Sequence, residues 1–228
     1  MSKCLIISRF KEDLCWLRNY RDFKIVIYNK GPEIKNAEFE NILNLQNVGR
    51  ESHTWLYHIV KNYHNLDDIN IFLQGRIDDL NCMAYENPIK YLKGIDNYGF
   101  VASRYGLLTP FHWKWNVGIE KDKRYKEKWE KTEISRSKIG FRQFSKKLFP
   151  NIPRFVATSY GGCFAVQKNY IRKYDIHFYS HLLDILSTHN NPIEGHYMER
   201  LWCYMYTENS RLARSFFDVF RTKYERYF

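Results

Sequence analysis

The sequence predicts a single-domain α/β fold in which helices flank a mostly parallel central sheet. The chain has 228 residues, 44% of them hydrophobic and 18% aromatic, which is typical of a globular domain with a full core. Its first third alternates short β-branched runs with segments of helical spacing, and this alternation predicts a parallel sheet. Neither an internal repeat nor a domain linker interrupts the chain.

Apolar runs and helical spacings set out the first elements in order. Cys4–Ser8, Phe23–Lys30 and Ile69–Gly75 are rich in β-branched residues and predict three strands. Between them, Glu12–Tyr20 and His53–His64 carry apolar residues at helical intervals and predict two helices. The order is therefore strand, helix, strand, connection, helix, strand.

The second half of the chain is less regular. Tyr98–Tyr105 predicts a fourth strand, and Phe155–Ile171 predicts a strand, a glycine turn and another strand. Phe111–Arg154 mixes charge with aromatic residues and has no clear period. Two amphipathic helices are expected at Phe178–Ser187 and Gly195–Glu208.

Polar residues follow the first and third strands, at the sheet edge where parallel sheets bind ligands. These candidate ligand contacts are Ser8, Glu12, Gln74 and Arg76. Asp78 and Asp79 come next, and two neighbouring carboxylates are able to hold a divalent cation that bridges diphosphate oxygens. The alternative is a solvated acidic turn.

A glycine turn precedes the second helix. Gly49 permits a backbone conformation that other residues avoid, and the turn brings Asn47 and Arg50 to a helix N-terminus, where backbone N–H groups attract anions. Arg50 adds a planar fork suited to phosphate or carboxylate. The alternative is an ordinary capped helix without a ligand.

The helix after Gly195 presents His196, Glu199 and Cys203 on one face, at spacings of three and four residues, opposite an apolar stripe. Glu199 is the candidate general base, with His196 beside it. The alternative is a solvated polar face in which Glu199 pairs with Arg200.

Two further features are candidate ligand contacts. Gly161 and Gly162 allow close approach of a ligand or of another backbone segment, and the alternative is a glycine-rich hairpin. Trp113, beside Trp115 and nearby lysines, offers a flat face on which a sugar or a nucleic-acid base is able to stack, or else packs on the core.

Charge and cysteine usage bear on partners and location. The net charge of +11 suits an acidic ligand, nucleic acid or an anionic membrane face, or is a plain lysine-rich surface. Five cysteines without a C-x-x-C pair indicate free thiols in a reducing compartment, and no apolar run reaches membrane-spanning length. We expect a cytoplasmic protein. The basic, aromatic-rich helix expected at Arg211–Phe228 either closes the core or contacts a membrane surface or a partner.

Several motifs together resemble an uncharacterised family catalogued as a domain of unknown function. They are N-x-G-R-E-x-x-T-x-L in "NVGRESHTWL", F-L-Q-G in "INIFLQG", G-x-F-x-V in "GGCFAV" and E-R-x-W in "GHYMERLW". The P-loop, G-x-G-x-x-G, G-x-S-x-G, H-E-x-x-H and EF-hand motifs do not occur, which speaks against the commonest enzymes of those classes.

The chain also resembles, more distantly, inverting glycosyltransferases of the GT-A fold, which is Rossmann-like. Asn47-Val48-Gly49 matches their N-x-G before a helix, and "INIFLQGRIDD" matches their strand leading to an acidic metal-binding motif. Gln74 stands where their first acid stands, so Asp78 and Asp79 are shifted ligands for Mn²⁺ or Mg²⁺, or else Arg50 and Arg76 replace the metal. Glu199 corresponds to their acidic base, although "ERLW" departs from the usual E-D dipeptide.

This second resemblance implies a glycosyltransferase that moves a sugar from a nucleotide-sugar donor to a glycan or another hydroxyl acceptor, in surface polysaccharide or glycan synthesis. Residues 1–110 would then be the nucleotide-binding half, 111–154 a variable basic and aromatic insertion, and 155–228 the acceptor-side half. This resemblance would place Gly161, Gly162 and Trp113 on the acceptor side. The alternatives are a nucleic-acid-binding module, which lacks any recognised motif, and a catalytically inactive scaffold of the same fold.

Overall fold

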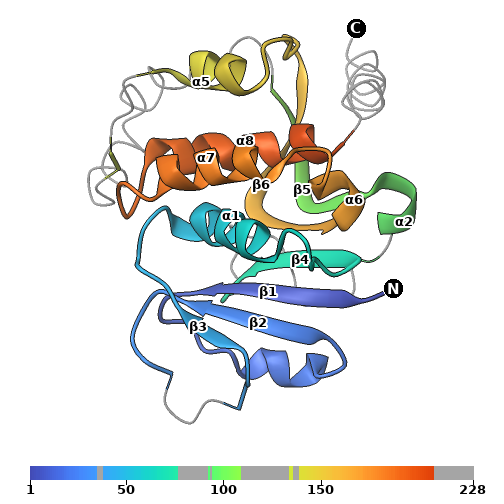
Figure 1. Cartoon of the computed structure of the whole chain (residues 1–228), viewed down its shortest axis with the longest axis vertical. Coiled ribbons are helices and arrows are strands. Elements are labelled where there is room, and N and C mark those ends of the chain that lie inside the picture. Colours follow the sequence, from blue (N-terminus) through green and yellow to red (C-terminus); the bar gives the residue numbers. More distant parts are fainter. Residues whose placement is uncertain (35–37, 77–91, 93, 109–133, 136–138, 208–228) are drawn as a thin grey trace, which may run out of the picture.

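A six-stranded sheet organises the part of the chain that the structure, a computed structural model, describes: residues 1–34, 38–76, 92, 94–108, 134–135 and 139–207 (Figure 1). The strands are β1 (Lys3–Arg9), β2 (Lys24–Asn29), β3 (Ile42–Asn44), β4 (Ile69–Gln74), β5 (Phe100–Leu108) and β6 (Val156–Gln167). Their order is β3-β2-β1-β4-β6-β5. The first four are parallel, whereas β6 runs antiparallel to both of its neighbours.

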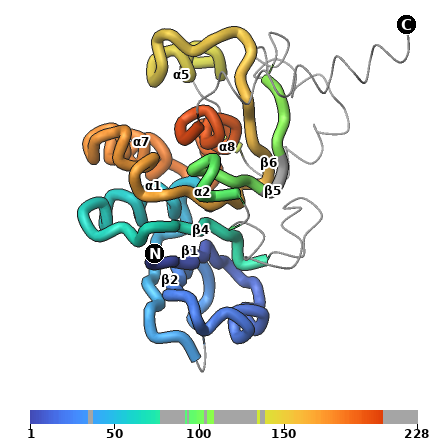
Figure 2. Tube along the Cα trace, turned by 90° about the vertical axis from the view of Figure 1, so that its right-hand side faces the viewer, coloured from blue at the N-terminus to red at the C-terminus, as the bar shows by residue number. Residues whose placement is uncertain are grey.

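Helices cover the sheet and confirm the predicted α/β fold with a mostly parallel sheet. They are η1 (Cys15–Tyr20), α1 (Arg50–Asn62), α2 (Ile95–Tyr98), α5 (Phe141–Leu148), α6 (Lys168–Ile171), α7 (Ile176–Leu186) and α8 (Ile193–Tyr206). Figures 1 and 2 show α1, α7 and α8 gathered on one side of β1 and β4. The short helix η1 packs on the opposite face through Leu17, together with Leu14 just before it.

The period of two along the strands divides the core between the two faces. In β1, Cys4 and Ile6 join the cluster under α1, α7 and α8, whereas Leu5 and Ile7 join the cluster under η1. All four side chains are fully buried. The run "CLII" is apolar throughout because both faces of this strand are covered.

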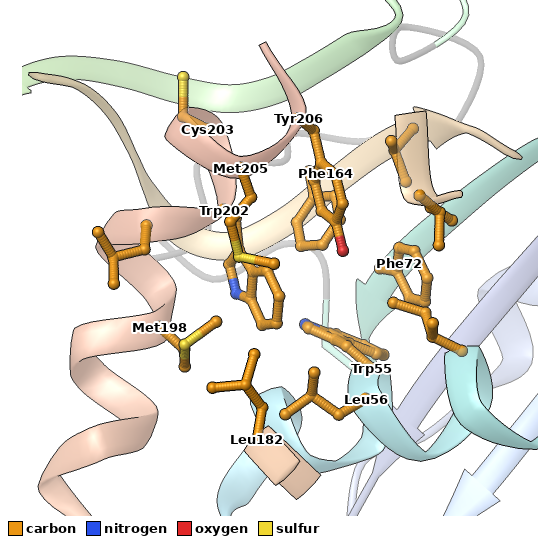
Figure 3. Packing of buried hydrophobic residues seen from close by; sticks show 14 of the residues in the cluster. Trp55, Leu56, Phe72, Phe164, Leu182, Met198, Trp202, Cys203, Met205 and Tyr206 are labelled. Carbon is orange, nitrogen blue, oxygen red and sulfur yellow. The ribbon is translucent and has the colours of Figure 1, made fainter. Parts of the chain in front are cut away.

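A chain of aromatic rings ties α8 to the sheet (Figure 3). The ring centroids of Trp55 and Phe72 lie 5.3 Å apart, those of Phe72 and Phe164 5.0 Å, and those of Phe164 and Trp202 5.6 Å. Such pairs contribute about 0.5–1.5 kcal/mol each beyond the area that they bury. They therefore fix the position of α8, which carries His196 and Glu199.

The predicted strand–turn–strand over Phe155–Ile171 is wrong. This segment forms the single strand β6, followed by α6, and the two glycines produce a bulge rather than a reversal. Gly161 and Gly162 have φ angles of 89° and 66°, and the pairing with β5 shifts register at this point. The extra residues are accommodated because glycine adopts positive φ without strain, so the strand bends and continues.

Two helix boundaries also differ from expectation. The helix expected at Glu12–Tyr20 is only the short 3₁₀ segment η1, since the Asp13 carboxylate accepts the Cys15 N–H and holds the preceding residues in a turn. The helix expected from His53 begins at Arg50, directly after Gly49, which confirms that Arg50 stands at a helix N-terminus.

The strand order reverses at β1. The chain passes from β1 outward to β2 and β3, and then returns through α1 to β4 on the other side of β1. Ser8 of β1 and Gln74 of β4 face each other across this pair. Open α/β sheets bind ligands at the carboxyl ends of strands beside such a reversal.

Three sets of predicted features lie outside the described residues. They are the metal-ligand candidates Asp78 and Asp79, the stacking candidate Trp113 and the helix expected at Arg211–Phe228. No helix among the described residues is both long and apolar enough to span a membrane.

Candidate functional site

A cavity of about 420 Å³ opens at the carboxyl ends of β1, β2 and β4, beside the start of α1. It is lined by Ser8, Arg9, Phe10, Glu12, Lys30, Asn47, Arg50, Glu51, Gln74, Asn190 and Asn191. Charged groups and amides dominate this wall. Its volume falls in the range of about 300–1,000 Å³ that is common for small-molecule sites.

The cavity brings together most of the residues predicted to contact a donor. Ser8, Glu12, Asn47, Arg50 and Gln74 line it, although 66 positions separate the first from the last in the sequence. Gly49 does not line it but is the N-cap of α1. Arg76 follows β4 and is absent from the cavity wall as described.

The side chains of Ser8 and Glu12 both make hydrogen bonds to other residues of the chain. The hydroxyl oxygens of Ser8 and Thr54 lie 3.0 Å apart. One carboxylate oxygen of Glu12 accepts the backbone N–H groups of Phe10 and Lys11, at 2.6 and 3.1 Å. Glu12 therefore shapes the loop after β1, with the exposed ring of Phe10 on the cavity wall.

A left-handed turn presents Arg50 to the cavity. Gly49 and Arg50 have φ angles of 60° and 50°, and Arg50 is the one described non-glycine residue with positive φ. A Cβ atom on Gly49 would lie 2.6 Å from the Leu186 carbonyl oxygen, so only glycine fits there. Backbone strain of this kind persists where surrounding contacts hold it, and it is concentrated at functional sites.

Lys30 is the buried cation of the cavity. It follows β2, its exposed fraction is 7%, and its Nζ donates to the carbonyl oxygens of Val48 and Arg50, each at 2.5 Å. Burial lowers the pKa of the ammonium from its ordinary value of 10.5 to about 7, against the opposing effect of the Glu51 carboxylate.

The glycine bulge of β6 connects Glu199 to the cavity wall. The Gly161 N–H donates to Glu199 Oε1 at 2.8 Å, and the Gly161 carbonyl accepts Gln74 Nε2 at 3.1 Å. A Cβ atom on Gly162 would lie 3.2 Å from Glu51 Cγ and Oε1. The bulge thus passes between two carboxylates, one on α1 and one on α8.

Burial raises the pKa of the Glu199 carboxyl above its ordinary range, and the Glu51 carboxylate adds to this effect. Arg200, whose Nη1 lies 3.7 Å from Glu199 Oε2, opposes it. The side chain of Glu199 is 19% exposed, so it keeps some access to solvent. A carboxylate of raised pKa is a better proton acceptor than an ordinary one.

His196 lies on α8, as Glu199 does, and contacts a residue of the cavity wall without lining the cavity. Its Nε2 is 3.1 Å from Asn191 Oδ1, and Asn191 lines the cavity. Burial, together with Arg50 and Arg200, lowers the pKa of the imidazole to about 3, so the ring is neutral near pH 7. Neither His196 nor Glu199 belongs to the cavity lining itself.

The predicted polar face of α8 is only partly correct. His196 and Glu199 are partly exposed, whereas Leu201 and Trp202 are buried, as expected. Cys203 was expected on the polar face but is fully buried in the core. Cys203 is buried because this part of α8 packs on the sheet: the rings of Trp202 and Tyr206 lie against those of Phe100 on β5 and Phe164 on β6.

Five polar residues of the cavity wall were not among the predicted site residues: Arg9, Lys30, Glu51, Asn190 and Asn191. Lys30 and Glu51 carry a local signal, since one ends a predicted strand and the other stands at a predicted helix N-terminus. Asn190 and Asn191 carry none, because they reach the cavity only through the packing of the α7–α8 connection beside Gly49 and Arg50.

The described residues contain no cluster of three or more histidine, cysteine, aspartate or glutamate side chains suited to a metal ion. Glu12 and Glu51 are the carboxylates of the cavity wall, and Glu12 is already bonded to backbone N–H groups. These residues do not by themselves make a metal site.

A comparison with protein-family models finds a family that covers most of the chain. The model of a family described as "Protein of unknown function (DUF3431)" matches residues 5–217, a span that contains the whole cavity wall as well as His196 and Glu199. No curated protein and no solved structure matches the chain.

Proposed function

The chain belongs to the DUF3431 family, as its motifs indicated, and from the cavity we propose that it is a glycosyltransferase that takes its sugar from a nucleotide-sugar donor. The acceptor would be a hydroxyl group of a glycan or of another molecule. The observation that carries this proposal is the cavity beside the strand-order reversal, where Lys30, Arg50 and the start of α1 converge.

The electrostatics of the cavity favour an anionic ligand. Lys30 and Arg50 supply positive charge, although Arg50 Nε also lies 3.6 Å from the Glu51 carboxylate. The first two residues of α1, Arg50 and Glu51, line the cavity, so the positive end of the helix dipole lies there. Asn47, Asn190 and Asn191 add amides that are able to bond ribose or sugar hydroxyls. A diphosphate between two sugars has this combination of charge and hydroxyl groups.

In the proposed reaction, the acceptor oxygen attacks the anomeric carbon of the donor sugar and the bond from that carbon to the diphosphate breaks. The acceptor proton passes to the carboxylate of Glu199. Lys30 and Arg50 stabilise the charge that develops on the leaving diphosphate. His196 is neutral and bonds the side chain of Asn191, so it holds that residue of the cavity wall in place; Arg50 and Arg200 are the charges near its ring.

The glycine bulge suits the acceptor side of this reaction. Because Gly162 has no side chain, the bulge packs directly against Glu51 and Gln74 of the cavity wall, and Gly161 bonds Glu199. This close packing brings Glu199 near the part of the wall where we place the acceptor. Asp78 and Asp79 remain the predicted ligands of Mn²⁺ or Mg²⁺, which would supply further charge neutralisation when bound.

The test is calorimetric titration with a panel of nucleoside diphosphates and nucleotide sugars, each with and without Mn²⁺. Arg50→Met should weaken nucleotide binding. Arg18→Met is the matched control: Arg18 lies on η1, away from the cavity wall, and the change removes only its exposed ion pair with Glu38, so this variant should bind normally. Failure of the wild-type protein to bind any member of the panel contradicts the proposal.

A further inference from the structure

Lys30 differs from a surface lysine because its side chain is buried and hydrogen-bonded. Its side chain is buried at the end of β2, and its backbone N–H donates to the Arg9 carbonyl at 2.8 Å, which fixes the residue to the neighbouring strand. The ammonium reaches across to Val48, just before α1, and to Arg50, its first residue. It is also part of the cavity wall.

The turn at Val48–Arg50 is held on both sides. Its N–H groups bond to the carbonyls of Gln46, His189 and Asn190, at 2.9, 2.8 and 3.3 Å, and the Gly49 carbonyl accepts the His53 N–H at 3.1 Å. The two remaining carbonyls, those of Val48 and Arg50, are the ones that Lys30 bonds. Lys30 thus completes the hydrogen bonding of a strained turn that carries Arg50.

An ammonium group has three N–H donors, and two of them are used on this turn. We propose that Lys30 and Arg50 form a binding site for a phosphate or diphosphate group, in which Lys30 gives its third N–H to the ligand while the other two hold the turn that presents Arg50. This inference deepens the proposed function, on which it rests, by assigning the donor's diphosphate to a buried lysine.

The proton on Lys30 links ligand binding to pH. The neutral amine keeps two N–H bonds, enough for Val48 and Arg50, so losing the proton removes the donor and the charge meant for the ligand. The Glu51 carboxylate on α1 favours the ammonium, and His53 on the same helix, with a pKa of about 4, is neutral near pH 7. The other charged groups on the cavity wall are Arg9 at the end of β1, Glu12 in the loop after it and Arg50 at the start of α1. An anion in the cavity should therefore draw a proton onto Lys30.

Inorganic pyrophosphate is the probe, because it carries the diphosphate without base or sugar. Titration at about pH 6 should give about 10- to 100-fold weaker binding for Lys30→Met than for the wild type, the loss of one charge-assisted hydrogen bond. Lys24→Met is the matched control, since Lys24 lies on the same strand at the opposite end, paired with Asp67, and should bind as the wild type does.

A second measurement covers the case in which Lys30→Met fails to fold. In the wild-type protein, an NMR titration of the Lys30 side chain should show its pKa rising when pyrophosphate is added. An unchanged pKa, or wild-type affinity in folded Lys30→Met, overturns the inference even if nucleotides bind elsewhere in the cavity. Lys30-dependent binding of pyrophosphate without any nucleotide binding would uphold the anion site and reject the proposed glycosyltransferase.

Discussion

The carboxylate of Glu199 accepts the backbone N–H of Gly161 at 2.8 Å, and Gly161 in turn accepts the side-chain amide of Gln74 at 3.1 Å. A helix near the end of the chain is thus joined, through one glycine, to the strand end that lines the cavity. This short path places a partly exposed carboxylate of raised pKa next to the proposed acceptor side.

Glu199→Gln tests the role of that carboxylate. The amide keeps the shape of the side chain and its oxygen is still able to accept the Gly161 N–H, but it no longer takes a proton. We expect nucleotide affinity to be retained and sugar transfer to fall by about 10²–10⁴-fold, the usual contribution of a general base. Transfer rates with a radiolabelled donor, beside thermal unfolding of both proteins, provide the measurement.

Two results would reassign Glu199. Wild-type transfer by the glutamine variant would make Glu199 a structural partner of Arg200. A loss of about 3–5 kcal/mol in the free energy of unfolding would identify it as a member of a buried ion pair.

Gly162→Ala tests the bulge. The residue has a φ of 66°, and an added Cβ would lie 3.2 Å from Glu51. We expect the free energy of unfolding to fall by about 1–2 kcal/mol, the penalty of a left-handed non-glycine residue. Gly195→Ala on α8 is the control, because its Cβ would meet nothing closer than 3.7 Å. Urea denaturation of the two variants compares them, and equal stability would contradict the strain argument.

Arg50→Gly and Arg50→Ala separate strain from binding. Both remove the guanidinium, so both should lose affinity for nucleotides, measured by calorimetry. They differ in the residue's φ of 50°, which glycine adopts freely and alanine does not. We therefore expect Arg50→Gly to be the more stable of the two by about 1 kcal/mol in urea denaturation. A more stable alanine variant would show that the turn stores no strain.

Lys30 should give stability a characteristic pH dependence. Its pKa is about 7 in the folded protein and 10.5 ordinarily, so between these values the unfolded chain binds the extra proton. Stability then rises with pH in this window. Relative to Lys30→Met, the wild type should gain up to about 1.4 kcal/mol per pH unit from about pH 7 upward. Denaturation curves across this range decide the matter, and parallel slopes for the two proteins would refute the lowered pKa.

The sequence by itself determined the strands and helices that carry local signals. β-branched runs located β1, β2 and β4, and the turn residue Gly49 located the start of α1 near Arg50. The rule that ligands gather at the carboxyl ends of parallel strands then selected Ser8 and Gln74, which indeed lie side by side. These features follow from the period of the side chains and from the allowed backbone angles of each residue.

Tertiary structure alone decided the rest. The pair Gly161-Gly162 predicts a hairpin from local sequence. In the structure, pairing of β6 with both β4 and β5 keeps the strand continuous and leaves a bulge at these glycines. The burial of Cys203 depends on which strands pack against α8. Lys30 becomes a buried cation only because Val48 and Arg50 offer their carbonyls from a turn that Asn190, far along the chain, holds in place. Local pattern does not encode such long-range contacts, since each depends on the position of a segment distant in sequence.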